Sequence, residues 1–386
     1  MVGTVNVTLL LSLAGRVPPP PDLPPGPPPP RPDAGPLGER LDTWARSRGL
    51  VLGDPTASAL GRARCDRLAA RLFPVAPLGR VELAARWLVW AFALDDALDT
   101  APLGDSATAV HDLYENLLTA LRRDRPRPGA QPLETALVEL WQQTAPGFSR
   151  VWRHRFVQHM QEHQVGCAEE AVNRRVGKTP SPAGYPGLRR RASAPFLYDL
   201  VEPTLGIELP PRLPLTPGWK ALVEGTADLV AWSNDVVSHR EEAARGDTHN
   251  HVAVLGAAHG LTAGPSLDAV AGRIAARAEE VTAAVKAVHG SLDRLGFSAA
   301  EQADIARIMK VVRDAPRAHL EWLWESGRYR TAQRTVAQHV PEPHVPEPHV
   351  PEQHVPERHE PGQYEPEQYE PEQYDGLLSV SLSRVD

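Results

Sequence analysis

Three aspartates near the end of an apolar segment are the first candidates for chemistry. The segment AFALDDALDT places Asp95, Asp96 and Asp99 at positions i, i+1 and i+4, with no lysine or arginine among them. On an α-helix, Asp95 and Asp99 lie about 40° apart on one face, where two carboxylates repel each other unless a cation lies between them. Carboxylate oxygens without cysteine or histidine select Mg²⁺ or Mn²⁺ over zinc. On its own, the pattern therefore leaves two interpretations equally open, a metal site and a solvated acidic helix end.

A second set of oxygen donors begins 139 residues after Asp95. In the segment NDVVSHREE, the side chains of Asn234, Ser238 and Glu242 are spaced four residues apart, so on a helix they form one stripe. An amide oxygen, a hydroxyl and a carboxylate can bind a second hard cation with a single formal negative charge. The stripe could also be the polar outer face of an amphipathic helix, but two such sites on two helices indicate a diphosphate held between them.

Cationic side chains suited to a diphosphate occur in two further segments. The segment GLRRRASAPF carries three consecutive arginines at 189–191, and Pro195 must end or kink its helix just after residues 193–194. Further along, WLWESGRYR places Arg328 and Tyr329 after a glycine that can stop a helix. Singly, these arginines would be surface charges. Beside two metal sites they complete an anion clamp.

Together these motifs resemble those of the bacterial class I terpene cyclases, and most of all the sesquiterpene synthases. In chain order they are the aspartate-rich motif Asp95-Asp96-x-x-Asp99, the diphosphate sensor, linker and effector at Arg190, Ser193 and Ala194, the triad Asn234-Asp235-x-x-Ser238-x-x-x-Glu242 continued by Gly246–Leu255, and the pair Arg328-Tyr329. Four ordered motifs make the resemblance specific. The sequence departs from the family where Glu241 replaces a frequent lysine, for which Arg240 could substitute, and where Pro195 follows the effector.

The resemblance implies roles for the aspartate-rich motif. Asp95 would ligate two of three Mg²⁺ ions, and Asp99 would assist or form a hydrogen bond from the same face. Asp96 would pair with an arginine in the closed enzyme. Mn²⁺ could replace Mg²⁺ at these oxygen ligands. The expected cofactor is therefore a cluster of three divalent ions.

The resemblance also assigns the remaining motifs. Asn234, Ser238 and Glu242 would hold the third ion, whereas Asp235 and Glu241 lie off the stripe and would face solvent or support the ligands. The arginines and the tyrosine would form hydrogen bonds to the diphosphate, and the helix break would contact the substrate. The residues expected to bind substrate in this way are Arg190, Ser193, Ala194, Arg328 and Tyr329.

The implied reaction is that of a class I terpene cyclase, a carbon–oxygen lyase acting on phosphates. It would ionise a linear isoprenoid diphosphate, farnesyl diphosphate in our interpretation, and cyclise the cation to a sesquiterpene hydrocarbon or alcohol with release of diphosphate. A diterpene cyclase using geranylgeranyl diphosphate is the main alternative. A chain-elongating prenyltransferase would need a second aspartate-rich motif, and a non-catalytic helical binding protein is opposed by intact ligand sets at both sites.

A carbocation must be kept from water, and aromatic faces stabilise it by cation–π interaction. Phe92 is the best placed candidate, one turn before Asp96. The other candidates are Trp87, Trp90, Phe196, Trp232 and Trp322. The released diphosphate can serve as the final base, so the reaction does not require a catalytic histidine.

The elements that position these residues are predicted to be helices. The helical patterns cover Leu68–Leu72, Val81–Leu94, Ala107–Arg123, Pro132–Glu162, Ala221–Arg245, Ser266–Leu295 and Ala299–Glu325. The segment 81–94 is apolar nearly all round, as in a helix buried inside a bundle. We find no alternating strands and no glycine-rich phosphate loop. The sequence therefore predicts an all-α fold, a single class I terpenoid synthase bundle of residues 37–335 around a central apolar cavity.

The two ends of the chain differ from this region in composition. Residues 18–36 contain 12 prolines, so we expect residues 1–36 to be a proline-rich disordered segment. Residues 336–386 form a low-complexity His/Pro/Glu/Tyr repeat with too few apolar residues for a core, and we expect a disordered tail. A solvated spacer is the favoured interpretation of this tail over an interaction module or a weak metal site.

Charge and cysteine content limit the partners and the compartment. Residues 331–386 carry 3 arginines and 11 acidic side chains, which leaves 38 basic and 37 acidic side chains elsewhere and argues against a nucleic-acid partner. Two distant cysteines give no disulfide framework, and the N-terminal apolar stretch lacks a basic region and is too short to span a membrane. We therefore expect a cytoplasmic enzyme with a small-molecule partner, the isoprenoid diphosphate. A homodimer is one assembly to consider.

Overall fold

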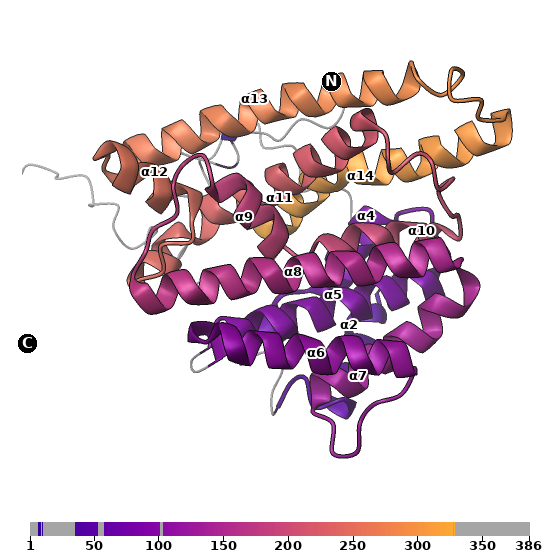
Figure 1. Ribbon diagram of the computed structural model, residues 1–386, viewed down its shortest axis with the longest axis horizontal. Helices are drawn as coiled ribbons and strands as arrows, with labels where there is room; N and C mark the ends of the chain where they lie inside the picture. The colour runs from indigo at the N-terminus through magenta and orange to yellow at the C-terminus, as the bar shows by residue number, and fades with distance from the viewer. Residues whose placement is uncertain are drawn as a thin grey trace, which may run out of the picture. The chain divides into compact units, whose positions relative to one another are not determined.

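The computed structural model of the chain describes residues 7, 8, 10, 35–52, 58–100, 103–326 and 328, all within the unit Met1–Val340. These residues contain helices and no strand, so the predicted all-α fold is confirmed (Figure 1). The α-helices are α2 Leu37–Ser47, α3 Ala59–Arg62, α4 Cys65–Leu72, α5 Leu78–Leu98, α6 Ala107–Arg123, α7 Pro132–Thr144, α8 Arg150–Val176, α9 Tyr185–Ala192, α10 Val201–Leu205, α11 Pro217–Ala244, α12 His251–His259, α13 Ala263–His289 and α14 Ala299–Glu325. The 3₁₀ helices are η3 Leu103–Asp105, η4 Ala145–Gly147 and η5 Pro195–Leu200.

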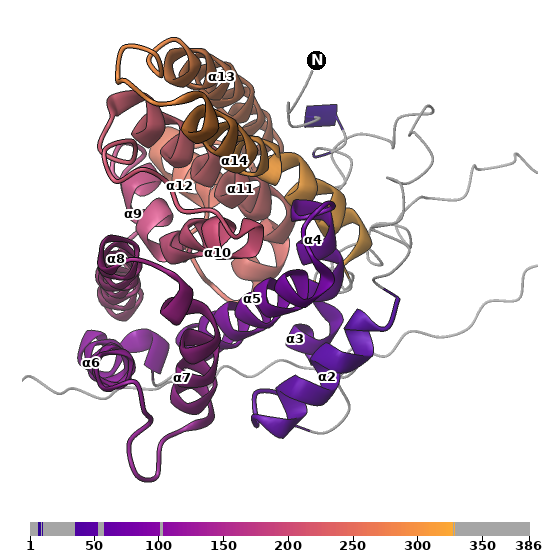
Figure 2. The ribbon, with the colours of Figure 1, turned by 90° about the vertical axis from the view of Figure 1, so that its right-hand side faces the viewer.

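Helix α5 carries the aspartate-rich motif and is buried along most of its length. In both views it lies between α11 and α7 (Figure 2). Its large side chains have almost no exposed surface, with Trp87 at 1% and Trp90 at 0%. The apolar residues on all sides of this helix are shielded from solvent because α2, α4 and α7 pack around it. The predicted buried helix is therefore confirmed, and it extends a few residues beyond each predicted end.

The prediction of one helix over Pro132–Glu162 is wrong. Helix α7 ends at Thr144, η4 follows, and α8 begins at Arg150. Pro146 falls in this 3₁₀ turn, and the Ser149 side chain accepts hydrogen bonds from the backbone N–H groups of the first turn of α8. A cap of this kind starts a new helix with a new direction. Helix α12, which is only 9 residues long, was not predicted from the sequence.

Helix α11 carries the second stripe and packs against α12, α13 and α14, while α8 packs against α6 and α9 (Figure 1). All three stripe residues fall within α11, as predicted. The predicted end of the arginine helix at Pro195 is also confirmed. Helix α9 stops at Ala192, Ala194 adopts a left-handed backbone conformation with φ of 51°, and Pro195 begins η5. This break carries the chain from α9 across the space between α5 and α11.

Two sequence predictions concern parts of the chain outside this description. The disorder predicted for residues 1–36 and 336–386 lies almost entirely outside the described residues, as does the unit Pro341–Asp386. Tyr329 is also outside them. None of the described helices is both long and apolar enough to cross a membrane.

Candidate active site

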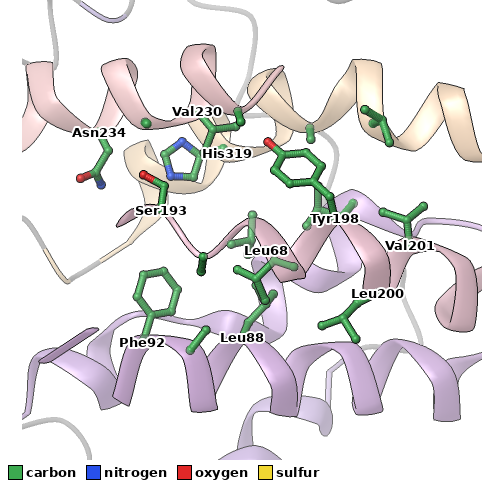
Figure 3. A pocket seen from close by; sticks show the side chains of 18 of the residues that line it. Leu68, Leu88, Phe92, Ser193, Tyr198, Leu200, Val201, Val230, Asn234 and His319 are labelled. Carbon is green, nitrogen blue, oxygen red and sulfur yellow. The ribbon is translucent and has the colours of Figure 1, made fainter. Parts of the chain in front are cut away.

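A cavity of about 230 Å³ lies between α5 and α11 (Figure 3). Phe92 and Leu88 face it from α5, Asn234 and Val230 from α11, and His319 from α14. Its remaining walls come from α4, α8, the α9–η5 break and α10. Most of the lining side chains are apolar, and the polar groups include Asp95, Arg189 and Asn234. The predicted central apolar cavity is therefore present, with these polar groups coming from the three helices α5, α9 and α11.

Asp95 and Asp96 share one cation, the guanidinium of Arg328. Arg328 donates to Asp96 at 2.5 Å and to Asp95 at 3.3 Å, and its guanidinium also lies 4.8 Å from the centre of the Phe92 ring. Asp95 borders the cavity, and 51% of its side-chain surface is accessible. Burial raises the pKa of Asp95, Arg328 lowers it, and the Asp96 charge raises it. The positive charge of Arg328 thus offsets part of the negative charge of Asp95 and Asp96.

Asp99 lies at the C-terminal end of α5 and pairs with a different arginine. Its carboxylate is 3.6 Å from Arg174 of α8, which also reaches Glu170 at 3.3 Å and Asp247 at 3.5 Å. Burial and repulsion by Asp95 raise the pKa of Asp99 to about 6. Arg174 therefore links the end of α5 to the segment that follows α11. Arg174 belongs to no recognised motif, so this link was not predicted from the sequence.

The stripe on α11 is held by a hydrogen-bond network. Asn250 donates to the Glu242 carboxylate at 2.8 Å and to the Asp235 backbone carbonyl at 2.7 Å. The Ser238 hydroxyl donates to the Asn234 backbone carbonyl at 2.9 Å. Burial raises the pKa of Glu242 to about 7, and the Asp235 charge adds to this increase. Of the three predicted oxygen donors, Glu242 is thus engaged in a contact that holds α11 against the start of α12, whereas the Ser238 hydroxyl bonds within α11.

The residues beside the stripe have different environments. Asp235 is fully buried and pairs with Arg189 at 2.9 Å, accepts from the Tyr185 hydroxyl at 2.7 Å, and accepts from the His251 backbone at 3.1 Å. The alternative that Asp235 faces solvent is therefore wrong, and its support of the ligands stays a prediction. Glu241 pairs with Arg245 at the surface, at 3.2 Å. Arg240 is exposed, which leaves the predicted substitution for lysine without support.

The three arginines of α9 have three different partners, and the one in the cavity is Arg189. Arg189 lines the cavity and donates to Asn234 at 3.4 Å. Arg190, the residue matched to the diphosphate sensor, instead pairs with Asp228 at 2.7 Å and Glu224 at 3.2 Å. The predicted position of Arg190 in the substrate site therefore disagrees with the structure. Three successive helical residues point about 100° apart, so at most one of them can face the cavity.

The break after α9 reaches the cavity as predicted. Ser193 and Ala194 both line it, and the Ser193 hydroxyl donates to the Arg189 backbone carbonyl at 2.6 Å. This bond closes the last turn of α9 where the helical ladder stops. On the opposite side, α8 approaches the break so closely that a Cβ at Gly166 would lie 2.6 Å from the Ala192 nitrogen. The break is thus held from both sides.

Of the six aromatic candidates, all of them among the described residues, Phe92 alone lines the cavity. Trp87 and Trp90 contact each other at 5.8 Å and donate to Thr144 and Leu133 in the core. Phe196, Trp232 and Trp322 are buried beside other rings, and Trp322 stacks on Phe92 at 5.5 Å. The aromatic lining that the sequence analysis missed consists of Phe73 and Tyr198.

The donor chemistry fits a hard divalent cation. Asp95 and Asn234 present a carboxylate and an amide oxygen to the same cavity from opposite walls, and its described lining contains no cysteine. Within the described ranges, no preassembled group of three His, Cys, Asp or Glu side chains is close enough to hold a metal. Magnesium usually takes one or two carboxylates and completes its shell with water and substrate phosphate. Open, incomplete sites are therefore what such an ion requires.

Comparisons with known proteins give one consistent answer. The family described as "Terpene synthase family 2, C-terminal metal binding" matches residues 86–280. The (-)-delta-cadinene synthase of Streptomyces clavuligerus is 30% identical over 74% of this chain and 88% of its own length. The farnesyl-diphosphate-cyclising (-)-beta-caryophyllene synthase of Saccharothrix espanaensis is 30% identical over 74% and 82%. The structure of a cucumene synthase variant superposes with a TM-score of 0.68 at 27% identity, covering 78% of this chain and 97% of that one.

Proposed function

This chain belongs to the bacterial class I terpene synthases, a metal-binding family of lyases, and we propose that it cyclises farnesyl diphosphate to a sesquiterpene hydrocarbon or alcohol. The observation that carries the proposal is the apolar cavity bordered by Asp95 and Asn234 on opposite walls and by Arg189. The farnesyl chain is supported by relatives such as the beta-caryophyllene synthase, which cyclises this substrate. Geranylgeranyl diphosphate is the alternative substrate.

We infer that three Mg²⁺ ions bind with the diphosphate. Asp95, assisted by Asp99, would hold two of them, and Asn234, Ser238 and Glu242 would hold the third. The mixed carboxylate, amide and hydroxyl donors support Mg²⁺ over softer metals, with Mn²⁺ as a substitute. When bound, the ions supply electrostatic stabilisation to the leaving diphosphate.

The side chains of this protein bind and orient the diphosphate. We assign the sensor role to Arg189 in place of Arg190, because Arg189 lines the cavity beside Asn234. Arg328 neutralises Asp95 and Asp96 until substrate arrives, and then donates to the diphosphate together with Tyr329. Arginine suits this exchange because it forms charge-assisted hydrogen bonds equally well to carboxylates and phosphates. Asp96 stays paired with Arg328 when the diphosphate is bound.

The apolar walls hold and shield the carbocation. Phe92 faces the cavity one turn before the metal ligands, so its ring can stabilise positive charge left by the departing diphosphate. Ser193 and Ala194 present the α9 break to the substrate from the facing wall. Leucine, valine and alanine side chains make up much of the remaining lining and exclude water from the cation.

Incubation with geranyl, farnesyl and geranylgeranyl diphosphates, each with Mg²⁺, tests the proposal. We expect cyclic C15 products from farnesyl diphosphate, identified by mass spectrometry of the extracts, and none when a chelator replaces the metal. Cyclic C20 products with no C15 products would establish the diterpene alternative. The absence of any cyclic product from all three substrates would contradict the proposal.

Three sequence predictions remain predictions beside this proposal: a cytoplasmic location, a homodimer, and a dispensable repeat tail. Sedimentation of the purified chain measures its oligomeric state. Removal of residues 339–386 tests the tail, and we expect unchanged cyclisation because no site residue lies in that segment. An inactive truncated enzyme would show that the tail does more than solvate the chain end.

A further inference from the structure

Two histidines line the cavity from different walls, His163 on α8 and His319 on α14. Both are almost fully buried, at 4% and 8% exposure. Their hydrogen bonding differs completely. The difference separates a histidine that supports the structure from one whose ring is available for chemistry.

His163 has partners for both ring nitrogens. Its Nδ1 lies 2.6 Å from the Tyr114 hydroxyl, and its Nε2 lies 3.2 Å from the Ala192 carbonyl. A carbonyl can only accept, so Nε2 must carry the hydrogen, and Nδ1 then accepts from Tyr114. His163 therefore holds the backbone of the α9 break. With both nitrogens engaged, it has no lone pair left for a proton.

His319 lies among apolar neighbours and lacks this support. Figure 3 shows its ring at the cavity, close to Val230 and Ser193. Within the part of the chain that the structure describes, its buried Nδ1 has no hydrogen-bond partner. The ring packs at 5.3 Å from Trp322. Leaving such a group unsatisfied destabilises the folded protein, so an aliphatic side chain would fit this wall better unless the imidazole has a task.

His319 is in the protonation state that a base requires. Burial, with a smaller contribution from the positive charge of Arg189, lowers the pKa of His319 to about 3. The imidazole is therefore neutral at physiological pH and carries one nitrogen lone pair. A carbocation is a far stronger acid than imidazolium, so even this weakened base can accept its proton.

We propose that His319 is the catalytic base that removes the proton from the final carbocation. This inference rests on the proposed cyclase function and adds its last step. The C–H bond beside the cationic carbon breaks, its electron pair forms the C=C bond of the product, and the proton goes to the imidazole. The released diphosphate then takes the proton from the imidazolium, which restores the neutral ring.

The test compares His319→Gln and His319→Phe with the wild-type enzyme on farnesyl diphosphate and Mg²⁺. Phenylalanine has no basic atom and keeps the contact with Trp322, whereas the amide oxygen of glutamine is a much weaker base than imidazole. We expect both variants to release diphosphate at no less than roughly a tenth of the wild-type rate, a barrier change of about 1.4 kcal/mol. The ring skeleton should stay the same, while the double bond moves or a water-quenched alcohol replaces the alkene.

Three results would overturn the proposal. Identical products from all three enzymes would show that another base acts. A changed ring skeleton would show that His319 only shapes the cavity, and loss of diphosphate release would show a role in ionisation. Wild-type protein that releases no diphosphate would instead refute the cyclase function itself.

His163→Gln is the matched control on the other wall. It removes the hydrogen bond to Ala192 and should loosen the α9 break, because glutamine cannot reproduce the fixed ring geometry. We expect slower diphosphate release with the double bond in its wild-type position. The same double-bond shift in His163→Gln would contradict a specific role for His319.

Discussion

The two walls that carry the metal motifs differ in how firmly their ligands are held. On α5, Asp95 and Asp96 depend on Arg328, which lies 233 and 232 residues away in sequence. Their side chains remain 51% and 38% accessible. On α11, Glu242 is fixed by Asn250, and the neighbouring Asp235 is fully buried with three donors around it.

This difference assigns different parts of the reaction cycle to the two walls. In the proposed function, the α11 wall is preorganised, and the side chains assigned as its ligands need little movement to bind a cation. The α5 wall would exchange Arg328 for metal and diphosphate, so it would be the wall that responds to substrate. Arg174 connects the two, because it contacts both Asp99 and Asp247. Changes at the α11 wall should therefore damage catalysis most.

The largest effect is expected from Glu242→Gln and Asn234→Ala. A bound metal contributes several kcal/mol of charge stabilisation, so turnover should fall at least about 100-fold. Asp99→Asn should cost less, because Asp99 lies at the helix end and already pairs with Arg174. Steady-state kinetics with farnesyl diphosphate, with circular dichroism as the control for folding, provides the measurement. A larger loss in Asp99→Asn than in Glu242→Gln would reverse the comparison.

The next effect distinguishes two adjacent arginines. Arg189→Lys keeps the charge but loses the planar fork that contacts Asp235 and Asn234, so diphosphate affinity should fall about tenfold. Arg190→Lys is the control, since its partners Asp228 and Glu224 lie away from the cavity. Calorimetric titration with inorganic diphosphate and Mg²⁺ measures both. A weaker site in Arg190→Lys, with Arg189→Lys unaffected, would restore Arg190 as the sensor.

Arg328→Met tests the exchange at the α5 wall. Without the arginine, Asp95 and Asp96 lose the cation that competes with metal, so Mg²⁺ alone should bind a few-fold more tightly. Turnover should nevertheless fall about tenfold, because the diphosphate loses a charged donor. Opposite changes in metal affinity and turnover are the expected result. A parallel loss of both would mean that Arg328 only maintains the fold of this wall.

A further effect concerns stability, not catalysis, and lies at the link between the walls. Burial raises the pKa of Glu170 to about 8 from 4.5, despite the opposing charge of Arg174. The folded state then holds a proton that the unfolded state has lost, so Glu170 destabilises the fold as pH rises from 4.5 towards 8. This pH dependence of the free energy of unfolding amounts to at most about 1.4 kcal/mol for each pH unit, and Glu170→Gln should remove it. Urea unfolding at several pH values measures it, and an unchanged slope would contradict the account.

The sequence was sufficient wherever local pattern decides the structure. The apolar run before Asp95 predicts a buried helix, and the spacing from Asn234 to Glu242 predicts a stripe, because both depend only on helical geometry. The break at Pro146 was missed because the segments on either side read as one helical pattern. The choice between Arg189 and Arg190 depends on how α9 lies against α11, which no local pattern records.

The positions of the aromatic residues and the histidines likewise depend on tertiary packing. Trp87 and Trp90 precede the motif closely, yet their indole groups turn into the core towards α7. Tyr198 lines the cavity because the break after α9 turns η5 towards it, which the sequence alone does not reveal. His319 stands in an ordinary helical segment, and its distinguishing feature is a buried ring nitrogen without a hydrogen-bond partner among the described residues.

The central claim is that both walls bind one metal–diphosphate group, and a crystal structure with Mg²⁺ and inorganic diphosphate tests it most directly. We predict metal ions at Asp95 and at the set Asn234, Ser238 and Glu242, with the diphosphate between them and contacted by Arg189. Arg328 should leave Asp95 and contact the diphosphate. A diphosphate bound away from this cavity, or metal at neither wall, would contradict the claim.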